Sequence, residues 1–156
     1  MNKILKAILT IAIPPVVGAL SAFLIRNNVF IYDVLQKPPF ALPNNLFSVV
    51  WGVLYITIGV GLYLFTTANV SPDDKSYGLT VFAFQLLLNF FWPILFFNFR
   101  MYLLAFILLI VLFVFVAITV SAFYNAKKSA GIVLLPYLLF LVYAGYLNFG
   151  VWFLNM

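Results

Sequence analysis

Five long apolar segments constrain this chain more than any other feature of its sequence. They span residues 4–25, 46–67, 77–98, 101–124 and 131–154, so each has about 22–24 residues. A helix of that length, rising 1.5 Å per residue, crosses a hydrocarbon core of about 30 Å. Backbone groups at membrane depth need internal hydrogen bonds, which a helix supplies. We therefore predict an all-α membrane protein, a single domain over residues 1–156 built as a bundle of five transmembrane helices.

The composition agrees with a lipid bilayer as the main solvent. Only 7% of the residues are charged and 67% are hydrophobic, whereas a soluble domain has about 25% charged residues. The eight basic residues are scattered, so we expect them to contact lipid headgroups and we expect no nucleic-acid partner. The three acids, Asp33, Asp73 and Asp74, fall outside the apolar segments, which disfavours proton-coupled transport through buried carboxylates.

The chain contains no Cys and no His. Disulfides, thiolate sites and the usual ligand of zinc, copper and haem iron are therefore missing. We expect no metal site and no required cofactor.

The first segment has two interpretations. Lys3 and Lys6 precede an apolar run, and Ala19-Leu20-Ser21 resembles a signal-peptide cleavage site. The run is longer than the apolar region of a signal peptide and contains Pro14-Pro15, which favours a retained helix. With five spans the two chain ends lie on opposite sides, and a basic excess of five against three favours an N-terminus in the cytoplasm.

The connection at residues 26–45 is stiff. Pro38, Pro39 and Pro43 fix their own φ angles and bias the residues before them toward extended backbone. We expect this segment to form a lid over one mouth of the bundle, and the alternative is a plain rigid connector.

Three segments carry amides or large aromatic rings at helical spacing, which places them on shared faces. These positions are Trp51, Tyr55 and Gly59 on the second segment, Gln85, Asn89, Trp92 and Pro93 on the third, and Phe140, Ala144, Asn148 and Trp152 on the fifth. An amide at membrane depth is costly unless paired, so these faces indicate either a ligand pocket or amides that join neighbouring helices. We expect Trp152 to lie in an interfacial belt and the phenylalanines of the fourth segment to face lipid, namely Phe106, Phe113, Phe115 and Phe123.

Three blocks of residues occur in a fixed order along these segments. They comprise Tyr32, Leu35, Lys37, Pro38, Pro43, Phe47, Trp51, Leu54, Tyr55 and Gly59, then Gln85-Leu86, Asn89, Trp92-Pro93 and Phe96-Phe97, and then Pro136-Tyr137-Leu138, Ala144, Leu147-Asn148 and Trp152. With five segments of matching length, nearly the whole chain resembles the TspO/translocator protein family, the tryptophan-rich sensory proteins also called peripheral benzodiazepine receptors.

The resemblance implies a five-helix TspO-like bundle, a homodimer, and a pocket under the first loop. Family members bind porphyrins and other tetrapyrroles, and some bind cholesterol or synthetic isoquinoline and benzodiazepine drugs. We expect a multi-pass protein of a prokaryotic cell membrane that binds protoporphyrin IX or a related tetrapyrrole and has a sensory or regulatory role. Together with the faces described above, this gives the ligand-binding residues Trp51, Tyr55, Asn89, Trp92, Phe140, Ala144, Leu147 and Asn148, and the lid residues Lys37, Pro38, Phe40 and Pro43.

This chain differs from the family pattern at positions that matter for the light-dependent degradation of porphyrin. Some bacterial members promote light-dependent degradation of protoporphyrin IX, and pocket tryptophans are implicated in it. This chain keeps Trp51 but has Phe40 and Phe140 where the family usually has tryptophan, and Asn44 where it has a proline. Phenylalanine stacks on a macrocycle but oxidises far less readily, so we predict binding without a catalytic residue.

Three alternatives stay open. The protein could be an enzyme that degrades porphyrin with light and oxygen through Trp51, a transporter of porphyrins or small lipids, or a partner-binding bundle whose contact face is the fourth segment. The cholesterol pattern fails, because Phe149 follows Leu147 where a tyrosine is needed and no basic residue comes after it. Lys37 and Arg26 are the cations expected to meet the carboxylates of a tetrapyrrole.

Overall fold

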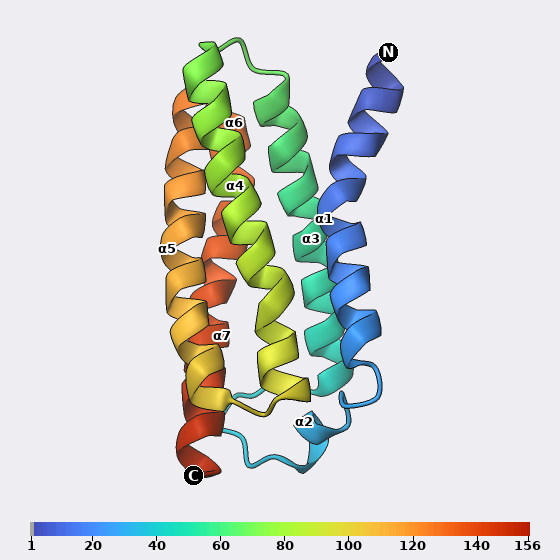
Figure 1. The fold of residues 1–156 in the computed structure, drawn as a ribbon, viewed down its shortest axis with the longest axis vertical. Coiled ribbons are helices and arrows are strands. Elements are labelled where there is room, and N and C mark those ends of the chain that lie inside the picture. The colour runs from blue at the N-terminus through green and yellow to red at the C-terminus, as the bar shows by residue number, and fades with distance from the viewer. Residues whose placement is uncertain (1) are drawn as a thin grey trace.

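The computed structural model describes residues 2–156 and arranges them as a bundle of five membrane-length helical spans (Figure 1). This confirms the predicted all-α membrane architecture. The elements are α1 (Lys3–Ile25), α2 (Ile31–Val34), α3 (Asn44–Thr66), α4 (Pro72–Pro93) with a π-helical turn (Ile94–Asn98), α5 (Tyr102–Ala126), α6 (Lys128–Ile132) and α7 (Leu135–Leu154).

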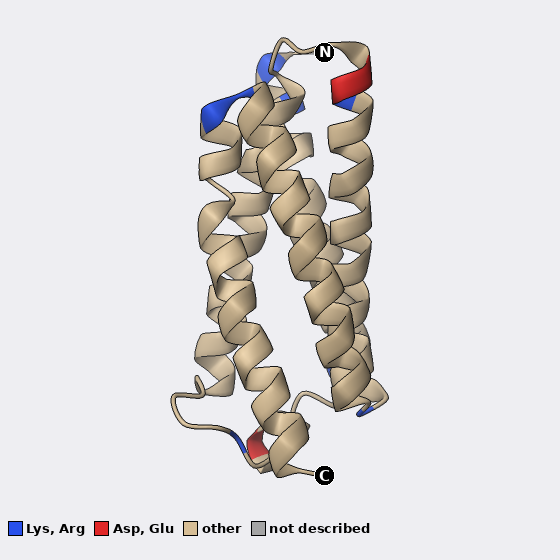
Figure 2. Ribbon diagram, turned by 90° about the vertical axis from the view of Figure 1, so that its left-hand side faces the viewer, with Lys and Arg blue, Asp and Glu red and all other residues tan. Residues whose placement is uncertain are grey.

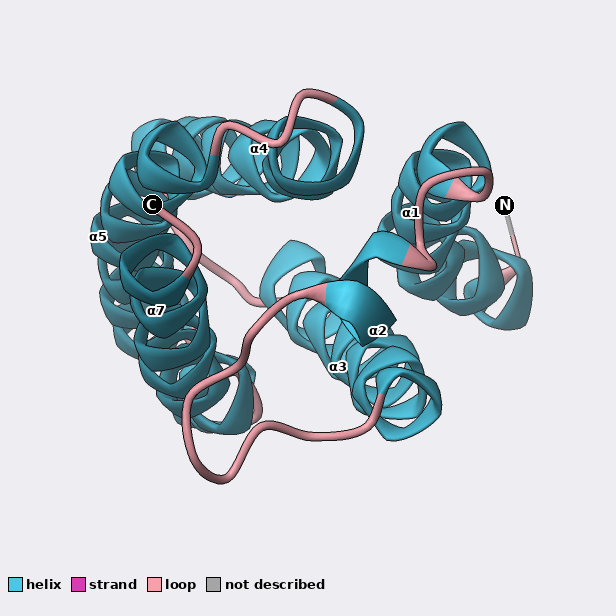
Figure 3. Cartoon of the chain, turned by 90° about the horizontal axis from the view of Figure 1, so that it is seen from below, coloured by secondary structure: helices cyan, strands magenta, loops and turns pink. Residues whose placement is uncertain are grey.

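The spans close into a ring. Helix α1 packs on α3 and α4, α4 packs on α5, α5 packs on α7, and α3 packs on α6 and α7. The view along the bundle from the α2 end shows α1 on one side and α5 and α7 on the other (Figure 3). Every span therefore has two helical neighbours, and a site inside the bundle can draw on several of them.

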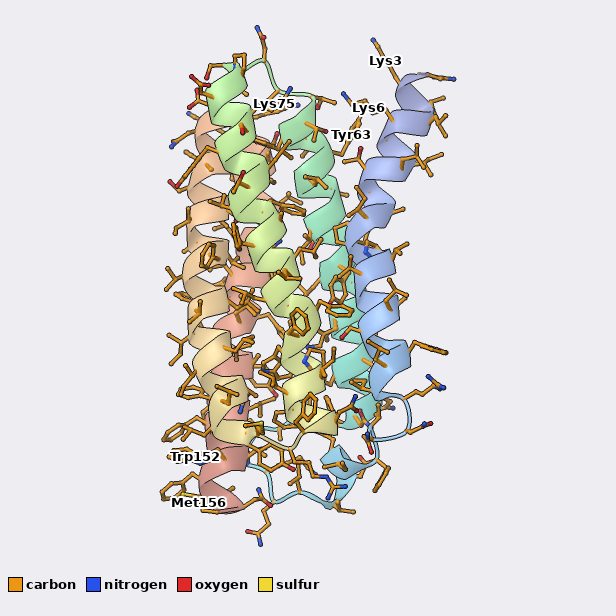
Figure 4. All side chains as sticks on the ribbon, in the orientation of Figure 1. Lys3, Lys6, Tyr63, Lys75, Trp152 and Met156 are labelled. Carbon is orange, nitrogen blue, oxygen red and sulfur yellow. The ribbon has the colours of Figure 1, made fainter. Side chains whose placement is uncertain are left out.

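Charged residues gather at the two ends of the bundle, and the long middle section carries none (Figure 2). Lys3, Lys6 and Lys75 lie at the end that holds the N-terminus (Figure 4). The loop with α2 and the C-terminus lie at the opposite end. This separation is what a bilayer requires, because charges stay at the headgroups and the hydrocarbon contacts apolar side chains.

Helix α4 begins five residues earlier than the predicted segment, at Pro72 rather than Tyr77. The reason is a local cap: the Ser71 hydroxyl accepts a hydrogen bond from the Asp74 backbone N–H at 3.1 Å. Proline at the first helical position and acidic residues in the first turn both favour a helix start. The helix therefore extends into the polar headgroup region, which hydropathy alone does not mark.

Prolines shape the ends of two other spans. Pro93 is followed by the π-helical turn, in which Phe99 N–H bonds to the Ile94 carbonyl at 3.1 Å. The fifth span is divided at Val133–Leu134, because Pro136 has no N–H to bond to the carbonyl of Ile132 and its ring crowds that carbonyl. The predicted first loop also differs, since it contains the short helix α2.

A stack of phenylalanine rings fills the half of the bundle nearer the N-terminus. Phe65 and Phe123 lie 4.1 Å apart with nearly parallel planes, and Phe82 stacks on Phe123 at 5.7 Å. Phe123 is 0% exposed, so the prediction that it faces lipid is wrong. Helix α5 is apolar on every side, so its sequence does not indicate which face is turned inward.

Candidate functional site

A cavity of about 360 Å³ lies between α1, α3 and α4 at the end of the bundle that carries the loop. Along α1 its lining begins at Pro15, and Val29 of the loop and Asn44 at the start of α3 also belong to the lining. Its lining consists of Pro15, Gly18, Ala19, Ser21, Ala22, Ile25, Val29, Asn44, Phe47, Ser48, Trp51, Gly52, Tyr55, Asn89, Trp92, Pro93 and Phe97. Its volume falls in the range of about 300–1,000 Å³ that is typical of small-molecule pockets.

One wall of the cavity is aromatic. Trp51 stacks on Trp92 with ring centroids 6.1 Å apart and a 27° angle between the planes. Tyr55 lies one turn along α3 with its ring 5.8 Å from that of Trp51, as the four-residue spacing predicts. Phe47 packs against both tryptophans. This wall can hold a flat conjugated ligand by stacking.

The facing wall, on α1, is made of small residues. Gly18 lies so close to the ring of Tyr55 that a methyl group added there would overlap it. Ala19 and Ala22 line the cavity and are also exposed, so the cavity reaches the outside of the bundle along α1. An aromatic wall opposite a wall of small residues forms a slot whose shape suits a disc.

Four polar side chains form a hydrogen-bonded chain behind the slot. The Tyr55 hydroxyl donates to Asn89 Oδ1, and Asn89 Nδ2 donates to the Tyr137 hydroxyl at 2.6 Å. The Tyr137 hydroxyl donates to Gln85 Oε1 at 3.0 Å. The chain joins α3, α4 and α7, so these amides do connect neighbouring helices, as one of the two interpretations of the sequence expects.

Trp51 has an unpaired donor. Its indole nitrogen is buried and is, among residues 2–156, the one buried side-chain nitrogen or oxygen without a hydrogen-bond partner. By contrast, Trp92 Nε1 donates to Asn148 Oδ1 at 2.9 Å. Buried polar groups are paired in nearly all native structures, so an unpaired one calls for an explanation.

The structure divides the eight predicted ligand-binding residues into two groups. Trp51, Tyr55, Asn89 and Trp92 line the cavity. The other four, Phe140, Ala144, Leu147 and Asn148, lie on α7, and the cavity lining does not include them.

The α7 group lies on the other side of the aromatic wall. The Phe140 ring meets Trp51 edge-on at 5.6 Å. Ala144, Leu147 and Asn148 border a much smaller space of about 10 Å³. Phe47 and Trp92 therefore separate them from the larger cavity, since both border the two spaces, and their contact with a ligand stays a prediction.

Two tyrosines of α7 fasten the loop. The Tyr143 hydroxyl donates to the Phe40 carbonyl at 2.8 Å and accepts from the Leu42 N–H at 3.0 Å. The Tyr146 hydroxyl donates to the Pro39 carbonyl at 2.9 Å. In the view along the bundle the loop runs from α2 to α7 and returns to α3 (Figure 3). The loop is therefore held across the end of the bundle by side chains of its last helix.

Other residues of the loop also contact α7 or the residue that follows it. Pro38 packs on Gly150, where an added methyl group would overlap its ring. Asn155 Nδ2 donates to the Gln36 carbonyl at 2.8 Å, and the Gln36 N–H donates to Asn155 Oδ1 at 3.0 Å. Phe40 has a φ of 63° and is 89% exposed, so its ring lies outside the cavity. That Phe40 takes part in ligand binding as a lid residue therefore stays a prediction.

The Lys37 ammonium group is engaged by the loop itself. Its Nζ lies 2.6 Å from the Tyr32 carbonyl, 3.1 Å from that of Leu35 and 3.4 Å from that of Asp33. It also lies 5.0 Å from the centre of the Tyr32 ring. These contacts cap the end of α2, so Lys37 has a structural role in the loop.

Tyr32 makes the loop sensitive to high pH. Its hydroxyl donates to the Leu42 carbonyl at 2.8 Å. Burial raises the pKa of Tyr32 to about 12, and the nearby Tyr143 hydroxyl and Asp33 carboxylate act in the same direction. Since an unfolded tyrosine ionises near pH 10.0, the contribution of Tyr32 to stability is complete below that pH and is lost as the pH rises toward 12.

We therefore expect proteolytic cleavage of the loop in detergent to increase between pH 10 and pH 12. A Tyr32→Phe variant lacks the hydrogen bond and cannot ionise at this position, so its cleavage should start higher and increase less over that interval. Tyr63→Phe, at the other end of the bundle (Figure 4), should keep the wild-type increase. An increase in Tyr32→Phe equal to that of the wild type would show that another group opens the loop.

Comparison with known proteins shows the family to which this chain belongs. A profile of the TspO/MBR family matches residues 10–153, a range that includes the loop and both walls of the cavity. The chain belongs to the TspO/MBR family. It is 34% identical to the tryptophan-rich protein TspO of Chlorobaculum tepidum over 99% of both chains. It is 36% identical to the protein of the same name in Archaeoglobus fulgidus, over 98% of this chain and 99% of that one.

A eukaryotic relative matches as well. The translocator protein of Bos taurus is 34% identical over 90% of this chain and 84% of its own. Membership of the TspO/MBR family and five apolar spans establish an integral, multi-pass membrane protein. The homodimer implied by the resemblance and the orientation in the membrane stay predictions.

Several residues of the TspO/MBR cavity were not among the predicted site residues. Gly18 and Ser21 supply the wall on α1, and the Ser21 hydroxyl donates to the Phe90 carbonyl at 3.0 Å. Phe47 supplies part of the aromatic wall, and Tyr137 lies behind it. Phe47 and Tyr137 belong to the blocks that identify the family, so that signal could have found them. For the residues of α1 the only signal is their small size.

Proposed function

We propose that this TspO/MBR protein binds a flat, largely apolar tetrapyrrole, protoporphyrin IX or a relative, in the cavity between α1, α3 and α4. Binding would serve a sensory or regulatory role. The observation that carries the proposal is the stacked pair of Trp51 and Trp92, which gives the cavity a broad aromatic wall. Aromatic stacking contributes about 0.5–1.5 kcal/mol per ring pair in addition to the burial of apolar surface.

The shape of the cavity supports a disc-shaped ligand. The rings of Trp51 and Trp92 offer a stacking surface, and the small side chains of Ala19 and Ala22 let a disc approach it. The slot reaches the outside of the bundle along α1, so the edge of a macrocycle wider than the cavity can extend toward lipid. A tetrapyrrole could then bind without any change in the helix order.

The carboxylates of a tetrapyrrole need a cation near the membrane surface. Lys37 is surrounded by three backbone carbonyls. Arg26 is exposed and directly follows Ile25, which lines the cavity. Its guanidinium donates to the Phe23 carbonyl at 2.7 Å and has further N–H groups. Arg26 is therefore the better candidate of the two predicted cations.

The test is a titration of detergent-purified protein with protoporphyrin IX in the dark, followed through the absorbance of the porphyrin. Trp51→Ala removes one ring of the stacking wall, so we expect binding roughly tenfold weaker than in the wild type. Trp152→Ala is the matched control, because Trp152 lies at the C-terminal end of α7 (Figure 4). Equal affinities of the wild type and Trp51→Ala, or no saturable binding by the wild type, would refute the proposal.

Illumination of the wild type and of Trp51→Phe with bound porphyrin tests a second function. The stacking of Trp51 on Trp92 at 6.1 Å favours photochemistry, because the radical cation left when an excited porphyrin takes an electron from one indole can be shared with the other. Loss of the porphyrin absorbance that requires the protein and disappears in Trp51→Phe would make Trp51 a catalytic residue. A stable spectrum would leave binding as the function.

A further inference from the structure

The slot opens sideways between α1 and α3. Ala19 and Ala22 on α1 line it and are exposed, and so are Ser48 and Gly52 on α3. A Cβ added at Gly52 would meet nothing from the rest of the protein within 4 Å, so this glycine leaves open space where a close helix contact could have formed. These four small residues frame a window from the bilayer into the slot.

The two helices close again toward the N-terminal end of the bundle. A methyl group added at Gly18 would overlap the Tyr55 ring, and one added at Gly59 would overlap the backbone carbonyl of Ile11. These contacts leave no gap between the helices beyond the slot. The window therefore belongs to the half of the membrane on the loop side.

The slot has the length of one lipid acyl chain. Its lining on α3 runs from Asn44 to Tyr55, which at 1.5 Å per residue is about 17 Å. One chain covers half of a hydrocarbon core of about 30 Å, which is about 15 Å. The Ser21 hydroxyl in the slot already donates to the Phe90 carbonyl at 3.0 Å. The Tyr55 hydroxyl donates to Asn89, so an apolar chain can fill the slot without breaking a hydrogen bond.

A polar hollow of about 450 Å³ continues the slot at the loop end of the bundle. Val29, Asn44 and Ser48 line both spaces. The hollow adds the side chains of Asp33 and Asn45. An apolar slot that ends in a polar hollow with a carboxylate has the shape and polarity of a lipid with an ammonium group in its headgroup.

Arg26 supplies the opposite charge on the same face of α1 as the window. It follows Ala19 by seven residues and Ala22 by four, which places the three on one face of the helix. Its guanidinium carbon lies 3.8 Å from the centre of the Phe23 ring, and it has N–H groups beyond the one that donates to the Phe23 carbonyl. A phosphate beside Arg26 and an ammonium group beside Asp33 would each meet an opposite charge.

We infer that the window, the slot and the hollow form a site for one zwitterionic phospholipid. One acyl chain passes between α1 and α3 into the slot, and the headgroup lies in the hollow, with its phosphate toward Arg26 and its ammonium group toward Asp33. The inference goes beyond the proposed function, because it concerns what fills the cavity in the membrane before any tetrapyrrole binds. A tetrapyrrole displaces this chain when it enters.

The test uses a protein in which Trp92 is the only tryptophan, made by Trp51→Phe and Trp152→Phe. Trp92 lines the slot and is 6% exposed, so lipid outside the bundle does not touch its ring. The protein is reconstituted into phosphatidylglycerol vesicles with increasing fractions of phosphatidylethanolamine that carries bromine in the middle of its acyl chains. Bromine quenches indole fluorescence at short range, so we expect saturable quenching of Trp92. An unquenched Trp92 would overturn the inference.

Gly52→Leu in this protein should remove most of the quenching, because the new side chain enters the window without meeting the rest of the protein. Val53→Leu is the matched control: Val53 is 56% exposed and does not line the slot, so full quenching should remain. Ala22→Leu closes the window from α1 and is expected to act in the same way, which covers a failure of Gly52→Leu to fold. Full quenching with the window closed from either side would overturn the inference.

Asp33→Asn tests the place of the headgroup. Because an exposed ion pair is lost, the fraction of brominated lipid that gives half-maximal quenching should rise about threefold. Asp73→Asn is the control, since Asp73 is exposed in the first turn of α4 at the other end of the bundle, and it should leave that fraction unchanged. Equal fractions for Asp33→Asn and the unsubstituted acid would overturn the placement of the ammonium group.

The result is separable from the proposed function, because the quenching assay contains no porphyrin. Failure of protoporphyrin IX to bind, with Trp92 quenched by the brominated lipid, refutes the tetrapyrrole and keeps the inference. Protoporphyrin IX binding without quenching of Trp92 by the lipid does the reverse.

Discussion

Replacing Asn89 with leucine is expected to lower the free energy of unfolding by about 2 kcal/mol, because two interhelical hydrogen bonds of up to about 1.7 kcal/mol each are lost. Asn89 is 2% exposed and bonds to Tyr55 and Tyr137 on two other helices. The leucine side chain has a similar volume, so the loss is mainly one of polar contacts. The Tyr55 hydroxyl then lacks an acceptor in an apolar surrounding.

Unfolding in a mixed-detergent titration, followed by helical circular dichroism, measures the effect. Asn125→Leu is the matched control, because Asn125 is exposed near the end of α5, and its midpoint should stay at the wild-type value. Unchanged stability of Asn89→Leu would mean that Tyr55 and Tyr137 find other partners, and the polar chain would then not hold the three helices together.

The second large effect is expected from Phe65→Ala, at about 3–5 kcal/mol of destabilisation. Phe65 is 1% exposed, stacks on Phe123 at 4.1 Å, and leaves no room for a side chain at Gly78. Removing the ring leaves a cavity between α3, α4 and α5 that the rigid helices cannot close. The packing contacts of the facing rings are lost outright.

The same detergent titration measures this loss, with Phe153→Ala as the control. Phe153 is 59% exposed near the end of α7, where detergent or lipid replaces the missing ring, so its effect should be small. Equal destabilisation by the two substitutions would show that the phenylalanine stack contributes no more than a lipid-facing ring.

The two effects differ in how far the sequence predicted them. Asn89 was predictable as a paired residue, because an amide in an apolar segment must find a partner. The burial of Phe123 was not, because every face of α5 is apolar and its inward side has no chemical contrast with its lipid side. The start of α4 was predictable only in part. Ser71, Pro72 and Asp74 form a cap signal in the sequence, but hydropathy does not register it.

The candidate site shows the same division. Trp51, Tyr55, Asn89 and Trp92 were predicted from helical spacing and the family resemblance, and all four line the cavity. The α7 residues carried the same pattern of amides and small residues, yet they lie beyond Phe47 and Trp92. Spacing along one helix shows which residues share a face, but it does not show which neighbour that face meets.

The sequence by itself determined the bilayer as solvent, the five helical spans, the stiff loop and the lack of His and Cys ligands, because these follow from composition, segment length and proline geometry. The tertiary structure decided which side of the aromatic wall is hollow, which tyrosines hold the loop, and which helices the chain from Gln85 to Tyr55 joins. These depend on helix order and rotation. In a membrane, packing and hydrogen bonding between helices set both, since lipid-facing and protein-facing residues are equally apolar.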